Sequence, residues 1–197
     1  MQYQNNNIIL KEGYNSIAIV LAFSILLSIF ISDLLANIGF LLTLILLFIY
    51  RNPNRNSFAS SSDIISPIDG IISAIDITDR KYKIYIDVNL CNTHLLRAPI
   101  SSKYKVKSKL NGLNLNSSTY KAKLLNTQAV LKFDNIKVKL ISGICNRDII
   151  LNENSKVKVG QEIGIFLNGL VVVEIPKEKK LKISISDKVY SGITPLV

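Results

Sequence analysis

A single histidine limits the acid–base chemistry that this chain could perform. His94 is the only histidine among the 197 residues, so a general-base step near neutral pH that needs an imidazole must use it. The residues that follow it, Leu95 and Leu96, are apolar. Taken alone, a histidine in this setting is more often structural than catalytic, so its surroundings have to decide between the two roles.

The other chemically active side chains have ordinary structural explanations when each is considered alone. Cys91 and Cys145 are the only cysteines, too few and too scattered for a disulfide framework or a zinc site. Asp69 precedes a glycine, which is typical of a tight turn in which glycine permits a positive φ. Arg97 could be a solvated strand residue. None of these residues indicates an enzyme without a wider pattern.

Two long apolar runs precede these residues and are predicted to anchor the chain. Residues 16–31 and 34–50 are each near the lower limit of the roughly 17 to 25 helical residues that cross a bilayer. Neither run has the polar face that a core helix normally turns to water. Lys11 precedes the first run, and Arg51 and Arg55 follow the second. The positive-inside rule therefore predicts a transmembrane helical hairpin with both ends in the cytoplasm.

A secretory signal peptide is the main alternative for the first run. A second apolar run follows it at once, however, and no small-residue cleavage site separates the two. We therefore predict a membrane anchor over residues 1–50, followed by a polar, serine-rich linker over residues 51–63 and a domain over residues 64–197.

The domain after the linker is predicted to be rich in β-strands. Residues 136–140 alternate apolar and basic side chains, and Asp134-Asn135 before them favours a tight hairpin with the preceding strand. The expected fold is a mainly β, sandwich-like or barrel-like domain after the helical hairpin. Predicted strands, which are rich in Ile, Val and Tyr, cover residues 70–78, 82–90, 104–110, 129–133, 136–144 and 164–175.

The net charge of +10 lies almost entirely in this β domain, because the first 50 residues contain one lysine and two acidic residues. Residues 103–109 alternate lysine with other residues and are predicted to form a solvated strand, since no nucleic-acid-binding motif accompanies them. With a membrane anchor present, anionic phospholipid is the favoured partner of the basic surface, and nucleic acid is not expected.

Several short motifs follow one another in a definite order. Residues 50–53 read Tyr-Arg-Asn-Pro, residues 66–70 Ser-Pro-Ile-Asp-Gly, residues 92–99 Asn-Thr-His-Leu-Leu-Arg-Ala-Pro, and residues 159–164 Val-Gly-Gln-Glu-Ile-Gly. Each motif is weak alone, but their order and spacing are specific. In these motifs the chain resembles the phosphatidylserine decarboxylases, in their shorter bacterial and archaeal form, over most of its length.

The resemblance implies a particular chemistry. In that family a serine attacks its own preceding carbonyl, assisted by a histidine and an aspartate, and the backbone splits while the serine becomes a pyruvoyl group. The ketone of that group is the electron sink for loss of CO2 from phosphatidylserine, which yields phosphatidylethanolamine. Carried over by motif, His94 would be the general base and Asp69 its orienting carboxylate. Arg97 would be a candidate ligand of the lipid phosphate.

The serine that this chemistry requires is missing. Alignment forward from Gly164 places Leu170 at its position, alignment backward from Pro176 places Gly169 there, and residues 156–183 contain no Ser, Thr or Cys. Residues 125–128 also lack both charges of a family motif. The sequence therefore predicts a decarboxylase homologue that cannot process itself and that lacks the pyruvoyl group.

Two other functions remain open at this point. The chain could be a working decarboxylase that obtains an electrophile by another route, which a fragment ending near Gly169 would reveal. It could also be a biotinyl or lipoyl carrier-like β module, suggested by Ser66-Pro67 and residues 157–161, although such modules usually place Met or Asp beside the modified lysine and the only Met is Met1. Self-association is possible in each case.

Overall fold

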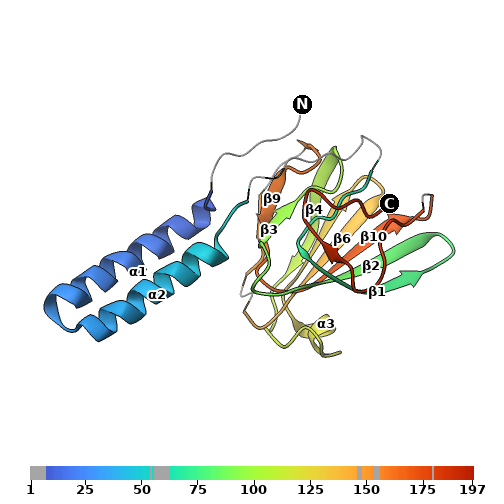
Figure 1. Ribbon diagram of the computed structural model, residues 1–197. Helices are drawn as coiled ribbons and strands as arrows, with labels where there is room; N and C mark the ends of the chain where they lie inside the picture. The colour runs from blue at the N-terminus through green and yellow to red at the C-terminus, as the bar shows by residue number, and fades with distance from the viewer. Residues whose placement is uncertain (1–7, 54, 56–62, 146–147, 153–155, 179) are drawn as a thin grey trace. The chain divides into compact units, whose positions relative to one another are not determined.

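The computed structural model describes residues 8–53, 55, 63–145, 148–152, 156–178 and 180–197 (Figure 1). The chain divides into two compact units, one formed by the N-terminal helices and one that runs from Arg55 to Val197. The predicted linker over residues 51–63 falls largely outside the described residues.

The first unit is a pair of packed helices, α1 (Lys11–Phe30) and α2 (Asp33–Ile49). Only Ile31 and Ser32 separate them, so the helices must run antiparallel. Small residues allow close contact, since a Cβ added at Gly39 would lie 2.2 Å from Oγ of Ser24. The open end is closed by backbone hydrogen bonds, among them one of 2.9 Å from the Leu10 N–H to the Tyr50 carbonyl.

The two helices differ in their capacity to cross a membrane. Among the described residues, α1 is the one helix long and apolar enough to do so by length and composition, whereas α2 has 17 residues and is shorter. Most large side chains of both helices are exposed within this unit. An apolar N-terminal helix is thus confirmed, and a hairpin that spans the membrane twice stays a prediction.

The second unit is mainly β, as predicted, and its sheets are antiparallel. An eight-stranded sheet has the order β11-β1-β2-β10-β6-β5-β4-β8, and a three-stranded sheet has the order β3-β9-β7. The strands are β1 (Gly70–Ile77), β2 (Lys81–Val88), β3 (Leu95–Arg97), β4 (Ser102–Leu110), β5 (Gln128–Phe133), β6 (Ile136–Ser142), β7 (Ile150–Leu151), β8 (Lys156–Val157), β9 (Glu162–Ile165), β10 (Gly169–Pro176) and β11 (Lys188–Val189). A short helix, α3 (Ala122–Leu125), precedes β5.

The predicted strand over residues 164–175 is wrong in one respect, because it is two strands in different sheets. The chain leaves the three-stranded sheet after Ile165 and enters the eight-stranded sheet at Gly169. Gly169 has φ +137°, a conformation that residues with a side chain rarely adopt. The turn residues Asn168-Gly169 mark this break, but the buried apolar residues on both sides of them give the same sequence pattern as a single strand.

The predicted hairpin at residues 134–135 is confirmed. β5 pairs with β6 so that Phe133 lies opposite Ile136, and Asp134 between them has φ 44°. In β6 the apolar side chains are buried, while Lys137 and Lys139 between them are partly exposed. The lysines of β4 are exposed too, which confirms a solvated strand.

β10 is the strand on which the large sheet depends. It pairs with β2 along residues 169–176 and with β6 along residues 169–174, so both of its edges are hydrogen-bonded. Val171, Val173 and Ile175 face the main core, which also contains the fully buried side chains of Phe133 and Phe166. The strand where the resemblance places the serine position therefore contributes three buried side chains to the main core.

One core residue carries a polar atom that the core does not satisfy. The Tyr104 ring stacks on Phe133 with 5.1 Å between ring centroids, and its hydroxyl is buried without a hydrogen-bond partner among the described residues. Burial raises the pKa of Tyr104 to about 12. An unsatisfied buried hydroxyl lowers stability, because the group loses its bonds to water and gains none.

Replacing Tyr104 by Phe is therefore expected to raise the free energy of unfolding by about 1 kcal/mol. The folded pKa lies above that of the unfolded chain, so the native protein should lose stability as the pH rises from about 10 towards 12. The Tyr104→Phe variant should not lose this part of its stability at alkaline pH. Urea unfolding at neutral and alkaline pH measures both effects, and a less stable variant at neutral pH would contradict the expectation.

Candidate active site

Asp69 lies at the start of β1 with its carboxylate buried and fully engaged. Oδ2 accepts a hydrogen bond of 2.7 Å from Nη2 of Arg55, and Oδ1 accepts one from Nη1 of the same guanidinium. The backbone N–H of Ser191 also donates to Oδ1, at 2.7 Å. This bidentate ion pair is nearly shielded from water, since the two side chains are 10% and 6% exposed.

The glycine after Asp69 has a different function from the one expected. Gly70 belongs to β1 and is not among the glycines with positive φ. A Cβ there would lie 2.5 Å from the carbonyl oxygen of Asp87 on β2. Glycine is therefore needed for close approach of two strands, and the interpretation of Asp69 and Gly70 as a simple tight turn is wrong.

Arg55 connects Asp69 to the segment that carries the histidine. Its Nη2 donates to Oγ1 of Thr93 at 3.3 Å, and its Nη1 donates to the carbonyl of Ser191 at 3.1 Å. Four segments that are far apart in sequence meet at this guanidinium. No sequence pattern predicted this contact, because Arg55 was interpreted as one of the charges that flank the apolar runs.

His94 is fully buried and adjoins the chain that leads to the missing serine. Its carbonyl accepts a hydrogen bond of 2.9 Å from the N–H of Phe166, three residues before Gly169. The structure thus brings Asp69, Thr93 and the backbone of His94 into one neighbourhood. Described partners of the Asp69 carboxylate are Arg55 and Ser191, so its predicted orienting action on His94 stays a prediction.

Arg97 is buried among protein groups. Its Nη1 donates to the carbonyl of Gly160 at 3.0 Å, and its Nη2 lies 3.7 Å from Oε1 of Glu162. A Cβ added at Gly192 would lie 2.9 Å from its Cδ. These contacts fasten the turn before β9 to β3. Its predicted role as a ligand of the lipid phosphate stays a prediction.

Of the two candidate serine positions, Gly169 leaves almost no space for a side chain next to the neighbouring strand β6. It lies opposite Ser142 of β6, and a Cβ at position 169 would meet the Ile141 carbonyl oxygen at 2.2 Å. Ser142 is fully buried, and its Oγ has no hydrogen-bond partner among the described residues. This hydroxyl, which sequence reasoning missed, is on the face to which a side chain at position 169 would point.

Leu170 lies on the other face of β10. Its side chain packs with Ile141 and Val172, away from the core that Val171 faces. Across β2 it is opposite Asp87, whose pKa is raised chiefly by partial desolvation. The two positions that alignment could not separate therefore present side chains to opposite sides of the sheet.

Asn126 lies in residues 125–128, where this chain lacks both charged residues of the family motif. Its side chain clamps two backbone segments together. Its Nδ2 donates to the carbonyls of Ser142, at 2.6 Å, and of Leu115, at 2.7 Å, while its Oδ1 accepts from the Leu115 N–H at 2.9 Å. The side chain is buried. Asn126 therefore joins the loop after β4 to the end of β6, next to Gly169.

Comparison with known proteins gives a consistent result. Residues 42–196 match the family model described as phosphatidylserine decarboxylase. The phosphatidylserine decarboxylase proenzyme of Rickettsia typhi is 32% identical, covering 95% of this chain and 88% of that protein. The one from Geotalea uraniireducens is 27% identical, covering 97% of this chain and 96% of that protein.

No solved structure matches the chain significantly. The family match spans both the segment with Asp69 and His94 and the strand with Gly169 and Leu170. The ordered motifs, the antiparallel β domain and these comparisons lead to one conclusion: the chain belongs to the phosphatidylserine decarboxylase family.

Proposed function

We propose that this chain is a membrane-anchored member of the family that remains uncleaved and binds phospholipid without decarboxylating it. One observation carries the proposal. Neither Gly169 nor Leu170 has a hydroxyl, and both lie in a strand that is hydrogen-bonded on both edges. Without a nucleophile at this point, the acyl shift that opens the chain in the family has no starting group.

The family depends on a pyruvoyl group, which supplies a ketone as electron sink. The residues at the expected position do not fit its formation, because neither Leu170 nor Gly169 has the β-oxygen that must form the ester and then leave by elimination before Cα can become the ketone with loss of ammonia. No catalytic step through this group is therefore assigned to the chain. Asp69 and Arg55 instead form a neutralised, buried pair that stabilises the site as a structural unit.

A purified sample of the full chain is expected to contain one polypeptide near 22.0 kDa and to release no CO2 from phosphatidylserine. Intact-mass measurement under denaturing conditions and a radiolabelled-substrate assay test the two parts. A second fragment with a carbonyl-blocked N-terminus would contradict the proposal. Ser142→Ala is the informative companion variant, because it removes the buried hydroxyl opposite Gly169 and would abolish any scission that starts there.

The surface of the β domain supports a role for anionic lipid. Four lysines, Lys81, Lys107, Lys132 and Lys137, line a groove of about 470 Å³ together with Asp134 and Glu178. Glu174 pairs with Lys81 at 3.5 Å and with Lys137 at 3.3 Å. Asp134, Glu178 and Glu174 offset three of the four lysine charges, which leaves a net charge of +1 at this groove. Near a negatively charged leaflet each such lysine contributes about 1 kcal/mol to binding.

We infer that the helical hairpin inserts into the membrane and that the basic β domain faces the cytoplasm. Chain lacking residues 1–50 is then expected to keep part of its affinity for vesicles with anionic lipid and to lose it as salt rises, since the Debye length is about 10 Å at 0.1 M. Liposome flotation measures this. In the full chain, Lys107→Gln with Lys132→Gln should reduce salt-sensitive binding; indifference to anionic lipid at low salt would contradict the lipid role.

A further inference from the structure

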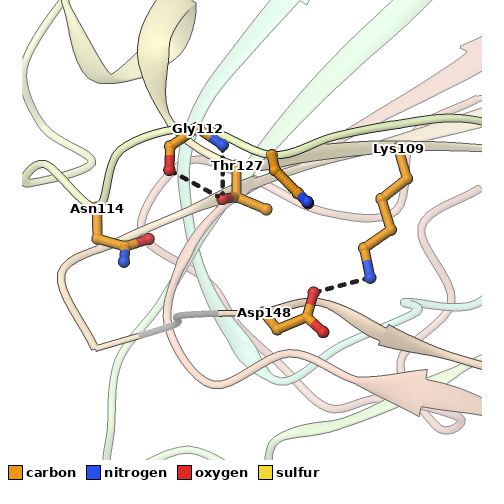
Figure 2. Close-up of a pocket in the computed structure, with 6 residues that line it drawn as sticks. Lys109, Gly112, Asn114, Thr127 and Asp148 are labelled. Carbon is orange, nitrogen blue, oxygen red and sulfur yellow. Dashed lines mark hydrogen bonds and ion pairs between the residues drawn. The ribbon is translucent and has the colours of Figure 1, made fainter.

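A polar pocket lies at the end of β4, close to the candidate site, and shares with the family motifs only Thr127 of residues 125–128. Its volume is about 510 Å³. Figure 2 shows Lys109 and Asp148 on one side of the hollow and the Gly112, Asn114 and Thr127 wall on the other. Asn111 completes the lining. Every lining side chain carries a charge, an amide or a hydroxyl, so the lining is mainly polar and suits a polar ligand better than an acyl chain.

The wall of this pocket is held in place by several contacts. The Gly112 N–H donates to Oγ1 of Thr127 at 3.1 Å, and a Cβ at Gly112 would lie 2.1 Å from the Leu125 carbonyl oxygen. The N–H of Thr127 donates to the Leu113 carbonyl at 3.1 Å. The same region is fastened by the buried Asn126 clamp. A preformed wall of this kind lowers the cost of ordering the site around a ligand.

The pocket also adjoins the candidate active site through the backbone. The Ser142 N–H donates to the carbonyl of Thr127 at 2.9 Å, and Ser142 lies opposite Gly169. One residue therefore separates the pocket wall from the strand that the family cleaves. A ligand in the pocket would lie at the same end of the large sheet as Gly169.

Two opposite charges lie side by side at the mouth of the pocket. Nζ of Lys109 is 2.7 Å from Oδ1 of Asp148, and the side chains are 38% and 62% exposed. The hydrogen bond from Lys109 is the main reason that the pKa of Asp148 is lowered, so this carboxylate is charged near neutral pH. An ion pair this exposed is worth less than about 1 kcal/mol, so a ligand can separate its members at little cost.

We propose that this pocket binds an α-amino-acid zwitterion, in which the ligand carboxylate pairs with Lys109 and the ligand ammonium pairs with Asp148. The neutral sum of the two side chains disfavours a simple anion or a simple cation, each of which would meet one repulsive partner. Asn111, Asn114 and Thr127 supply polar groups for the rest of the ligand. A serine phospholipid headgroup carries this zwitterion, so the inference rests on the proposed lipid-binding function.

The test is calorimetric titration of the full chain in detergent micelles. Glycerophosphoserine is expected to bind at least about tenfold more tightly than glycerophosphoethanolamine, which has the ammonium but no carboxylate. Lys109→Gln and Asp148→Asn should each weaken glycerophosphoserine binding by about tenfold. The double variant Lys109→Asp with Asp148→Lys should recover most of the affinity, because the ligand can reverse its orientation.

Lys182→Gln is the matched control. Lys182 forms a comparable exposed pair of 2.9 Å with Asp63, outside the pocket, and its loss should leave binding unchanged. Free L-serine is titrated in parallel: the tighter of the two serine ligands identifies lipid headgroup or free amino acid as the source. Equal binding of the serine and ethanolamine compounds, or no effect of either single variant, would overturn the inference. Intact mass tests the uncleaved state separately, so the two proposals can fail independently.

Discussion

Replacement of Arg55 by Met is expected to lower the free energy of unfolding of the β domain by about 3 kcal/mol or more. The guanidinium is 10% exposed and makes both hydrogen bonds of a bidentate pair with Asp69. Its removal leaves a buried carboxylate with the Ser191 N–H as the remaining described donor. A buried charge that loses its partner is costly because neither water nor another cation replaces the lost interaction.

Urea unfolding followed by circular dichroism measures this loss in the full chain. Arg55→Met combined with Asp69→Asn should cost less than the sum of the single changes, since the double variant no longer buries an unpaired charge. Lys182→Met breaks an exposed pair and should cost less than about 1 kcal/mol. A similarly small loss for Arg55→Met would show that the pair with Asp69 contributes little to the fold.

Restoring a serine to β10 is expected to fail in two different ways. Gly169→Ser places a Cβ 2.2 Å from the Ile141 carbonyl oxygen, in a backbone with φ +137°. Backbone atoms of a paired strand cannot move away without breaking ladder hydrogen bonds. We expect this variant to lose about 3 kcal/mol or more of stability, because steric overlap and backbone strain act together.

A serine at position 170 fits the backbone, but its side chain points to the face of β10 opposite the core. Residue 170 faces the cluster of Ile141 and Val172, opposite to the face on which Ser142 lies beside position 169. The substitution should cost about 2 to 3 kcal/mol through lost packing and leave a hydroxyl near Asp87, away from the core face.

Neither serine variant should therefore cleave itself to more than a trace, and intact mass after prolonged incubation measures this. Removing His94 in the same background provides the control. If either variant cleaves itself efficiently and His94→Ala abolishes the cleavage, the site had lost its nucleophile and nothing else. That result would contradict the expected misplacement of the new serine hydroxyl.

The sequence predicted the elements that have a local cause. Alternation along residues 136–140 and the turn residues Asp134-Asn135 predicted the β5–β6 hairpin, and both patterns depend on residues close together in the chain. The turn residues Asn168-Gly169 signalled a break between β9 and β10, but the assignment of these strands to different sheets could not be predicted in the same way. Which sheet an apolar strand joins depends on distant partners, here β3 for one half and β2 with β6 for the other.

In the candidate site too, the sequence predicted residues that lie in local motifs and missed those that the fold brings together. Motifs alone located Asp69 and His94, because their family spacing is written in the sequence. The partners Arg55, Ser191 and Ser142 were missed, since each reaches the site only through the fold. Alignment also left Gly169 and Leu170 equivalent, whereas strand pairing gives them opposite faces and different neighbours.

The double pairing of β10 has a practical consequence for anyone who looks for a broken chain. A nick just before Gly169 would leave the downstream piece held by ladders to β2 and β6 and by the core side chains of Val171, Val173 and Ile175. The two pieces would co-elute on a sizing column like the halves of a split protein. The size of the native protein therefore does not reveal whether the chain has been cleaved. Separately produced halves of this domain would also be expected to reassemble by strand complementation.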